Sequence, residues 1–287
     1  GELVEIHGTC LHVQSLGDSY APVSVLFENG TAGVTSHWGW VAPEVARRTH
    51  VVLYDRPGQG WSPSMPGKRT AKEVLRLFHG ALEVKGVRPP YILVGYAHGG
   101  LFSRLFAQEY PEEVAGMVLV DPQPEAVEDI FPPGWLHRQA RLNWWLSLAS
   151  RLGLLRLSGL AEQVESCLPE QQAAEAIAFL YAESAPRSWR EEQALALSAE
   201  QSLEPSRNPL RELPLIVLSA GQADSVIPGR VRPEYTARQA ALADLSERGR
   251  HRVVDGADHF TIILQEEYAR RVAQAIGEVY EKVINEK

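Results

Sequence analysis

One short segment of the sequence has the residue spacing of a nucleophile turn. An apolar run at residues 91–94 is followed by residues 95–100, Gly-Tyr-Ala-His-Gly-Gly, and then by a stretch of helical character. This is the nucleophile-elbow pattern Gly-x-Ser-x-Gly with an alanine, Ala97, at the centre. The central residue of such a turn is strained, and its neighbours must be small, as Gly95 and Gly99 are. The chemistry would be attack on an acyl carbon, but alanine has no hydroxyl with which to attack.

A sheet must position this turn, and the sequence predicts one. Short apolar runs rich in β-branched residues alternate with longer segments of helical period, which is typical of an α/β fold with a mostly parallel sheet and helices on both faces. Strands are predicted at about residues 3–6, 9–15, 22–28, 50–54, 91–95, 114–120, 214–219 and 251–255. Helices are predicted at about residues 37–47, 70–86, 98–110, 231–247 and 262–285.

Residues 122–205 interrupt this alternation. They contain no convincing strand and have the pattern of several helices separated by Pro and Gly. Because a structureless loop of that length is improbable in a compact domain, we expect a helical lid inserted over the C-terminal edge of the sheet. Its tryptophans pack between lid helices, form an apolar roof over a substrate pocket, or do both. They are Trp135, Trp144, Trp145 and Trp189.

Across essentially its full length the chain resembles the α/β-hydrolase superfamily, in the serine-hydrolase branch that carries a helical cap. The motifs follow successive predicted strands: Asn29-Gly30-Thr31, residues 54–62 (YDRPGQGWS), the elbow, Val118-Leu119-Val120-Asp121, Gly221-Gln222-Ala223-Asp224 and Gly256-Ala257-Asp258-His259-Phe260. The resemblance implies an eight-stranded, mostly parallel sheet flanked by helices. Its core would comprise residues 1–121 and 206–287, with the cap at 122–205. The loop at 54–62 is interpreted as a structural turn.

The resemblance also implies the catalytic residues. The family places its general base just after the last strand, at the position of His259. A carboxylate must orient that imidazole and stabilise its charged form. Asp224, after strand seven, is preferred because it matches the commonest acid position. Asp121, at the end of strand six, is the alternative.

An oxyanion hole is implied beside the elbow. In this family its backbone N–H donors come from the residue after the nucleophile and from a residue after strand three, which map to His98 and Thr31, next to Gly30. Asn29 stands where relatives usually have histidine. No metal or organic cofactor is implied. The residues expected to contact substrate are Asn29, Tyr96, Trp144 and Trp145.

The function implied is hydrolysis of carboxylic esters or lactones when serine occupies position 97. With Ala97 the chain should bind substrate without turnover, since loss of such a nucleophile costs about a millionfold. Ala97 is interpreted either as a replaced serine of an active hydrolase, which the presence of His259 and the acids favours, or as the mark of a natural ligand-binding or receptor-like relative. The fold also hosts amidases, peptidases and C–C bond hydrolases. A peptidase would need acids in the lid to grip an amino terminus, and Glu183, Glu191 and Glu192 are available.

Composition restricts the partners. The formal net charge of −8, with no Lys/Arg run, argues against nucleic acid. Cys10 and Cys167 have no metal-ligand spacing, so neither a disulfide framework nor a zinc site is predicted. No apolar stretch is long enough to span a bilayer and no signal-like leader is present, which favours a cytoplasmic protein that does not bind membranes. The expected partner is a small, largely apolar ester or lactone, and the oligomeric state is not predicted.

Overall fold

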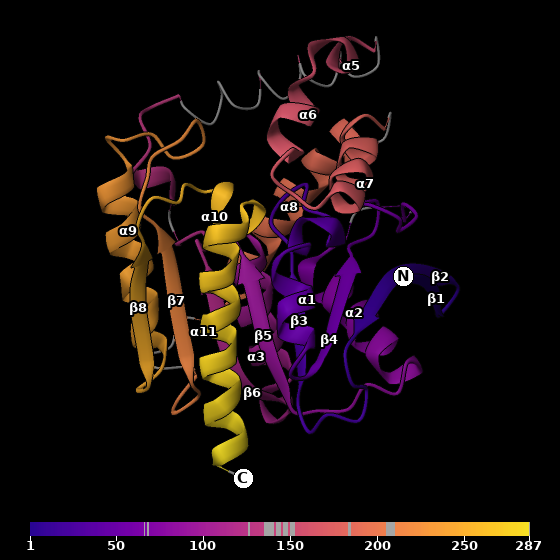
Figure 1. The fold of residues 1–287 in the computed structure, drawn as a ribbon, viewed down its shortest axis with the longest axis vertical. Helices are drawn as coiled ribbons and strands as arrows, with labels where there is room; N and C mark the ends of the chain where they lie inside the picture. The colour runs from indigo at the N-terminus through magenta and orange to yellow at the C-terminus, as the bar shows by residue number, and fades with distance from the viewer. Residues whose placement is uncertain are drawn as a thin grey trace.

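A computed structural model describes residues 1–65, 67, 69–125, 127–134, 141, 145, 149, 153–182, 185–204 and 210–286. One eight-stranded sheet forms its centre, in the order β1-β2-β4-β3-β5-β6-β7-β8 (Figure 1). Strand β2 pairs antiparallel with β1 and β4, and all other neighbours are parallel. The predicted α/β-hydrolase fold, with its mostly parallel sheet, is confirmed. The strands are β1 (Glu2–Ile6), β2 (Thr9–Leu16), β3 (Ser24–Glu28), β4 (His50–Asp55), β5 (Tyr91–Tyr96), β6 (Val114–Val120), β7 (Leu215–Ala220) and β8 (Gly249–Val254).

The middle residues of the central strands are apolar because both faces of the sheet are covered. In β3, Val25 and Phe27 join the core cluster on one face, whereas Leu26 joins the cluster on the other. The same alternation places Val51 and Val52 of β4 on opposite faces. Successive side chains of a strand point to opposite faces, so burial of both produces continuous apolar runs, as parallel sheets require.

Helices cover the two faces in two groups. Helices α1 (Val41–Ala46) and α11 (Glu266–Asn285) pack on one face, and α2 (Ala71–Val84) and α3 (Gly99–Glu109) pack on the other. Helix α2 begins with a capping box, in which Thr70 and Glu73 each bond the other's backbone N–H. Helix α9 (Arg232–Ala241) lies beside β7 and β8 (Figure 1). Short 3₁₀ helices are η1 (Thr35–Trp38), η2 (Pro111–Glu113), η3 (Val127–Asp129) and η4 (Leu242–Leu245).

The predicted C-terminal helix at 262–285 is two helices. Helix α10 (Thr261–Leu264) ends at Gln265, which is extended, with φ −98° and ψ 127°, and α11 follows. Ile262 and Ile276 nevertheless belong to the same core cluster. The apolar spacing therefore continues through the break and does not reveal it. The predicted helices at 37–47 and 231–247 also divide, into η1 with α1 and α9 with η4.

The described part of residues 122–205 is helical and contains no strand. Besides η3, it holds α5 (Leu154–Ser158), α6 (Leu160–Glu165), α7 (Glu170–Leu180) and α8 (Ala185–Ser202). Helices α5, α6 and α7 stand above the upper edge of the sheet in Figure 1. Helix α8 packs on α2 and α3 and buries Leu195 and Ala199 in their cluster. In the part of the chain that the structure describes, no helix is both long enough and apolar enough to cross a membrane.

Candidate active site

Ala97 occupies the corner between β5 and α3 with a left-handed backbone, φ +51°. Its N–H donates to Val120 O at 3.1 Å, which ties the corner to the neighbouring strand. A Cβ at Gly95 would lie 2.6 Å from Gly99 O, and a Cβ at Gly99 would overlap Glu28 O. The small residues of the elbow are therefore required by the close approach of β3, β5 and α3.

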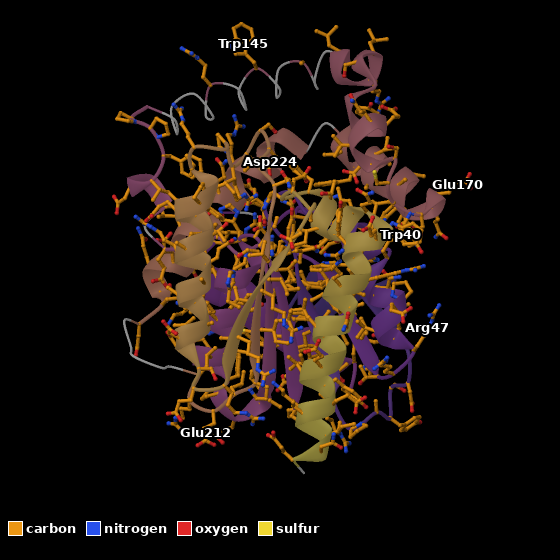
Figure 2. All side chains as sticks on the ribbon, turned by 60° about the vertical axis from the view of Figure 1, so that its left-hand side comes forward. Trp40, Arg47, Trp145, Glu170, Glu212 and Asp224 are labelled. Carbon is orange, nitrogen blue, oxygen red and sulfur yellow. The ribbon has the colours of Figure 1, made fainter. Side chains whose placement is uncertain are left out.

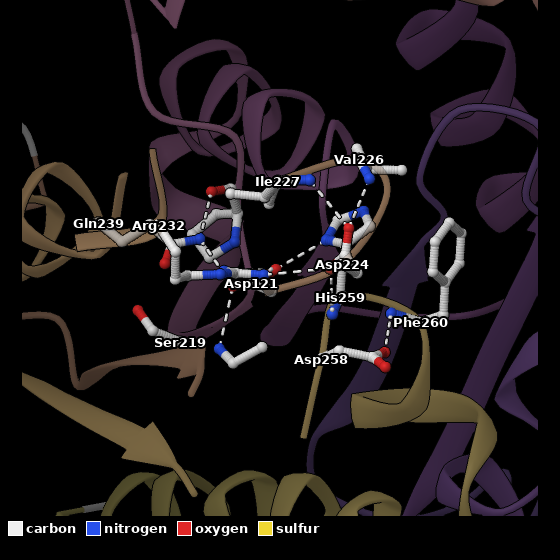
Figure 3. A network of polar contacts seen from close by, with 12 residues as sticks. Asp121, Ser219, Asp224, Val226, Ile227, Arg232, Gln239, Asp258, His259 and Phe260 are labelled. Atoms are coloured by element: carbon white, nitrogen blue, oxygen red, sulfur yellow. Dashed lines mark hydrogen bonds and ion pairs between the residues drawn. The ribbon is translucent and has the colours of Figure 1, made fainter. Parts of the chain in front are cut away.

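His259 lies in the loop between β8 and α10, and its ring contacts a buried carboxylate. Its Nδ1 is 2.7 Å from Oδ2 of Asp121, a fully buried residue just after β6 (Figure 3). Asp121 is itself left-handed, with φ +38°. Fixing Nδ1 in this way leaves Nε2 as the ring nitrogen available to move a proton.

Asp121 is surrounded by donors. Its Oδ1 accepts from Ala220 N at 3.0 Å, Arg232 Nη1 at 3.0 Å and Gln239 Nε2 at 2.9 Å (Figure 3). Burial alone raises the pKa of Asp121, but the hydrogen bond to His259 and the charges of His259 and Arg232 outweigh it and hold the pKa below its usual value. Asp121 is consequently a carboxylate at neutral pH.

The Asp224 carboxylate accepts hydrogen bonds from backbone N–H groups and does not contact the imidazole of His259. Its Oδ1 accepts from the N–H groups of Val226 at 2.6 Å and Ile227 at 2.8 Å, and its Oδ2 accepts from the His259 N–H at 3.0 Å. Arg232 connects the two acids, since its Nη2 is 3.4 Å from Asp224 Oδ2. Both acids named from the sequence thus meet at His259, Asp121 at the ring and Asp224 at the main chain (Figure 3).

The loop after β3 lies against the elbow. A Cβ at Gly30 would be 3.1 Å from Ala97 Cβ, and Thr31 Oγ1 is 2.8 Å from His98 Nδ1. Among the described residues, neither the Thr31 N–H nor the His98 N–H has an acceptor. Burial, with the charges of His259 and Arg56, lowers the pKa of His98 to about 3, so that its ring is neutral. These are the two N–H groups that are expected to form the oxyanion hole.

The sequence matches the alpha/beta hydrolase family over residues 16–275. The chain belongs to this family. It is 30% identical over 117 residues to the uncharacterized protein YqjL of Bacillus subtilis. The aligned region covers 41% of this chain and 46% of YqjL. The chain spans less than half the length of three curated relatives that it matches.

Two solved structures share the hydrolase fold. A thermophilic esterase from Thermogutta terrifontis superimposes with a TM-score of 0.66 at 21% identity, covering 99% of both chains. Est816, an N-acyl homoserine lactone degrading enzyme, gives a TM-score of 0.64 at 17% identity and covers 95% of this chain and 99% of its own. At these identities the likeness shows the fold alone.

The four residues expected to contact substrate differ in their surroundings. Tyr96 is nearly buried, its ring stacks on His259 with centroids 5.1 Å apart, and its hydroxyl donates to His259 O at 2.6 Å. Asn29 is buried and its Oδ1 has no partner among the described residues. Trp145 is 57% exposed and lies far from Asp224 (Figure 2). Trp144 is outside the described residues.

Arg232 and Gln239 hold the Asp121 carboxylate in place, and no motif in the sequence points to either. The sequence pattern at 54–62 predicts a structural turn. Asp55 does organise that turn, by accepting from Thr35 N at 2.8 Å and Trp61 N at 3.1 Å. Arg56, however, is almost fully buried and reaches the loop beside the elbow. The only available signal was its position inside a motif of the family.

Proposed function

We propose that this chain hydrolyses carboxylic esters or lactones through an acyl-enzyme when serine occupies position 97, with His259 as base and Asp121 as the carboxylate that orients it. The observation that carries the proposal is the 2.7 Å contact between His259 Nδ1 and Asp121 Oδ2, beside a left-handed elbow at Ala97. Asp224, preferred from the sequence, is given the supporting role of holding the His259 main chain.

The steps follow from this arrangement. In the Ala97→Ser protein the installed hydroxyl oxygen bonds the acyl carbon while its proton passes to Nε2 of His259. The N–H groups of Thr31 and His98 stabilise the oxyanion that forms. The carbon–oxygen bond to the leaving alcohol then breaks, and the alcohol oxygen takes the proton from Nε2. Water repeats the sequence on the acyl-enzyme and releases the acid.

We further propose that residues 122–205 form a cap that closes the substrate site. The support is that its described part is helical and that α5, α6 and α7 stand above the sheet edge (Figure 1). The use of its acids in peptide recognition is disfavoured. Glu192 is buried and pairs with Arg56 at 2.5 Å, and Glu191 pairs with Arg69 at 2.5 Å. Glu183 is outside the described residues.

Ala97 itself favours a second candidate, a non-catalytic protein that binds an ester-like ligand. In that case the site would keep its acid–imidazole pair without turnover. The chain as written is expected to behave as this candidate does, so binding by the Ala97 protein does not discriminate between the two. Only restoration of the hydroxyl does.

The test is hydrolysis of graded esters, lactones and amides by the Ala97→Ser protein, with the Ala97 chain as the blank. A fluorophosphonate probe, which phosphonylates activated serines with loss of fluoride, should label the Ala97→Ser protein and not the Ala97 chain. Turnover of esters or lactones, with amides resistant, is the expected result. A folded Ala97→Ser protein that neither reacts with the probe nor turns over any substrate would refute the hydrolase proposal in favour of the binding protein.

A further inference from the structure

Arg56 is a buried cation aimed at the loop beside the elbow. It follows β4 directly and is 2% exposed. Its Nη1 donates to Asn29 O at 2.9 Å and its Nη2 donates to Gly30 O at 2.7 Å. Two consecutive carbonyls of the loop after β3 are thus held by one planar group, whose donors have a fixed geometry.

Bonding the Gly30 carbonyl fixes the direction of the Thr31 N–H. The carbonyl of Gly30 and the N–H of Thr31 belong to the same peptide unit, which is planar and trans, so the two bonds point in opposite directions. While Arg56 holds the carbonyl on one side, the N–H must point away from Arg56. A charged donor on the carbonyl also polarises the unit and makes its N–H a stronger donor.

The guanidinium is itself held from the other side by helix α8. Glu192 accepts from Arg56 Nε at 2.8 Å and from Nη2 at 2.5 Å, and it is only 2% exposed. Glu28 accepts from Nη1 at 3.2 Å, and the Phe102 ring lies 4.7 Å from the guanidinium carbon. The Arg56 side chain can therefore make all these contacts in only one position. The Glu192 carboxylate on α8 helps to hold it there.

We propose that Arg56 and Glu192 are positioning residues for the oxyanion hole. Through this ion pair, the packing of α8 against α2 and α3 fixes the direction of the Thr31 N–H bond. The inference rests on the proposed function for its catalytic consequence, but the arrangement of the loop can be measured without it. Glu191, the adjacent acid, provides a matched control because it pairs with Arg69, whose other hydrogen bond is to Pro57 O rather than to the loop after β3.

The catalytic test compares Glu192→Gln with Glu191→Gln in the Ala97→Ser background. An amide at position 192 can accept from only one side and turns its own N–H donors toward the guanidinium. Removing one oxyanion donor outright costs about 10²–10³ in kcat, so misdirecting it should lower kcat about tenfold or more. KM should stay within about twofold, because the donor acts on the transition state and not on the bound ester. Glu191→Gln should leave both parameters within about twofold.

The structural test uses the Ala97 chain and needs no activity. The Gly33 N–H donates to Gly30 O at 3.1 Å, so its hydrogen exchange reports how firmly the Gly30 peptide is held. Exchange at Gly33 should become about tenfold faster in Glu192→Gln and stay unchanged in Glu191→Gln. If Glu192→Gln does not fold, Glu192→Asp, which keeps the charge, replaces it in both tests with the same expected directions.

The outcomes are distinct. Loss of kcat at constant KM, with faster Gly33 exchange, in the Glu192 variant alone supports the proposal. If the Ala97→Ser protein is inactive, the proposed function fails, and faster Gly33 exchange in the Glu192 variant alone still supports the positioning of the loop. The proposal is overturned if the Glu192 and Glu191 variants have the same kcat. If the Ala97→Ser protein has no turnover, equal hydrogen exchange at Gly33 in the two variants overturns it instead. A rise in KM with unchanged kcat also overturns it, since that would assign Glu192 to substrate binding.

Discussion

Replacing Asp121 by Asn in the Ala97→Ser protein tests which acid serves His259. Oδ1 of Asp121 receives three donors, so the amide oxygen of Asn must take that side. The amide NH₂ then occupies the Oδ2 side and faces His259 Nδ1, which lies 2.7 Å away in the present structure. The imidazole must accept there and carry its proton on Nε2, where it can no longer take a proton from the nucleophile. We expect kcat to fall about 10⁴-fold.

The matched control is Asp224→Asn. This change weakens the anchor of the His259 main chain at 3.0 Å but leaves the tautomer alone, so we expect a loss of at most about a hundredfold. Initial rates with a chromogenic ester, together with thermal melts, separate catalysis from folding. The melts matter because Asp121→Asn leaves Arg232 with Asp224 as its one carboxylate partner among the described residues and should cost about 3 kcal/mol. A larger kcat loss in Asp224→Asn, with both proteins folded, would contradict the assignment.

Two further predictions concern stability. Burial raises the pKa of Glu28 to about 7 from 4.5, and a raised pKa favours the native state at low pH. The stability that Glu28 contributes is thus complete below about pH 4.5 and lost as pH rises through about 7, a change of about 3 kcal/mol. Urea titrations at pH 5 and 7.5 give the change in unfolding free energy between the two pH values. This change should be smaller in Glu28→Gln than in the parent protein, and an equal change in both would refute the prediction. Ala97→Gly should stabilise the protein by up to about 1 kcal/mol by relieving a left-handed alanine at φ +51°, and lower stability in the same titration would contradict it.

The strands were predictable because their signal is local. A run such as Val51–Tyr54 is apolar on both faces and ends at a turn, and β5, β6 and β7 repeat that pattern. The elbow was predictable for a related reason, since Gly95 and Gly99 are fixed by the closeness of backbone to backbone. Each of these signals lies within one short segment of the sequence, although Gly99 is required by the approach of Glu28 in β3.

The choice between Asp121 and Asp224 was not predictable in this way. Both follow parallel strands, and the difference lies in where each carboxylate points, which depends on the left-handed turn at Asp121 and on Arg232 between them. The pairing of Arg56 with Glu192 joins residues 136 positions apart. Nothing near either residue signals the other, so this contact appears only once the chain is folded.

The ion pair of Arg56 and Glu192 limits which segments of this chain can be replaced by those of a relative. A chimaera that replaced residues 122–205 with the equivalent segment of another family member would have to supply a carboxylate at the same place on the helix that packs against α2 and α3. Otherwise the buried guanidinium of Arg56 would lose one of the two carboxylates that pair with it in the described part of the chain, at a cost of several kcal/mol. Recombination that seeks new substrates is therefore best confined to α5, α6 and α7, with α8 inherited together with the sheet.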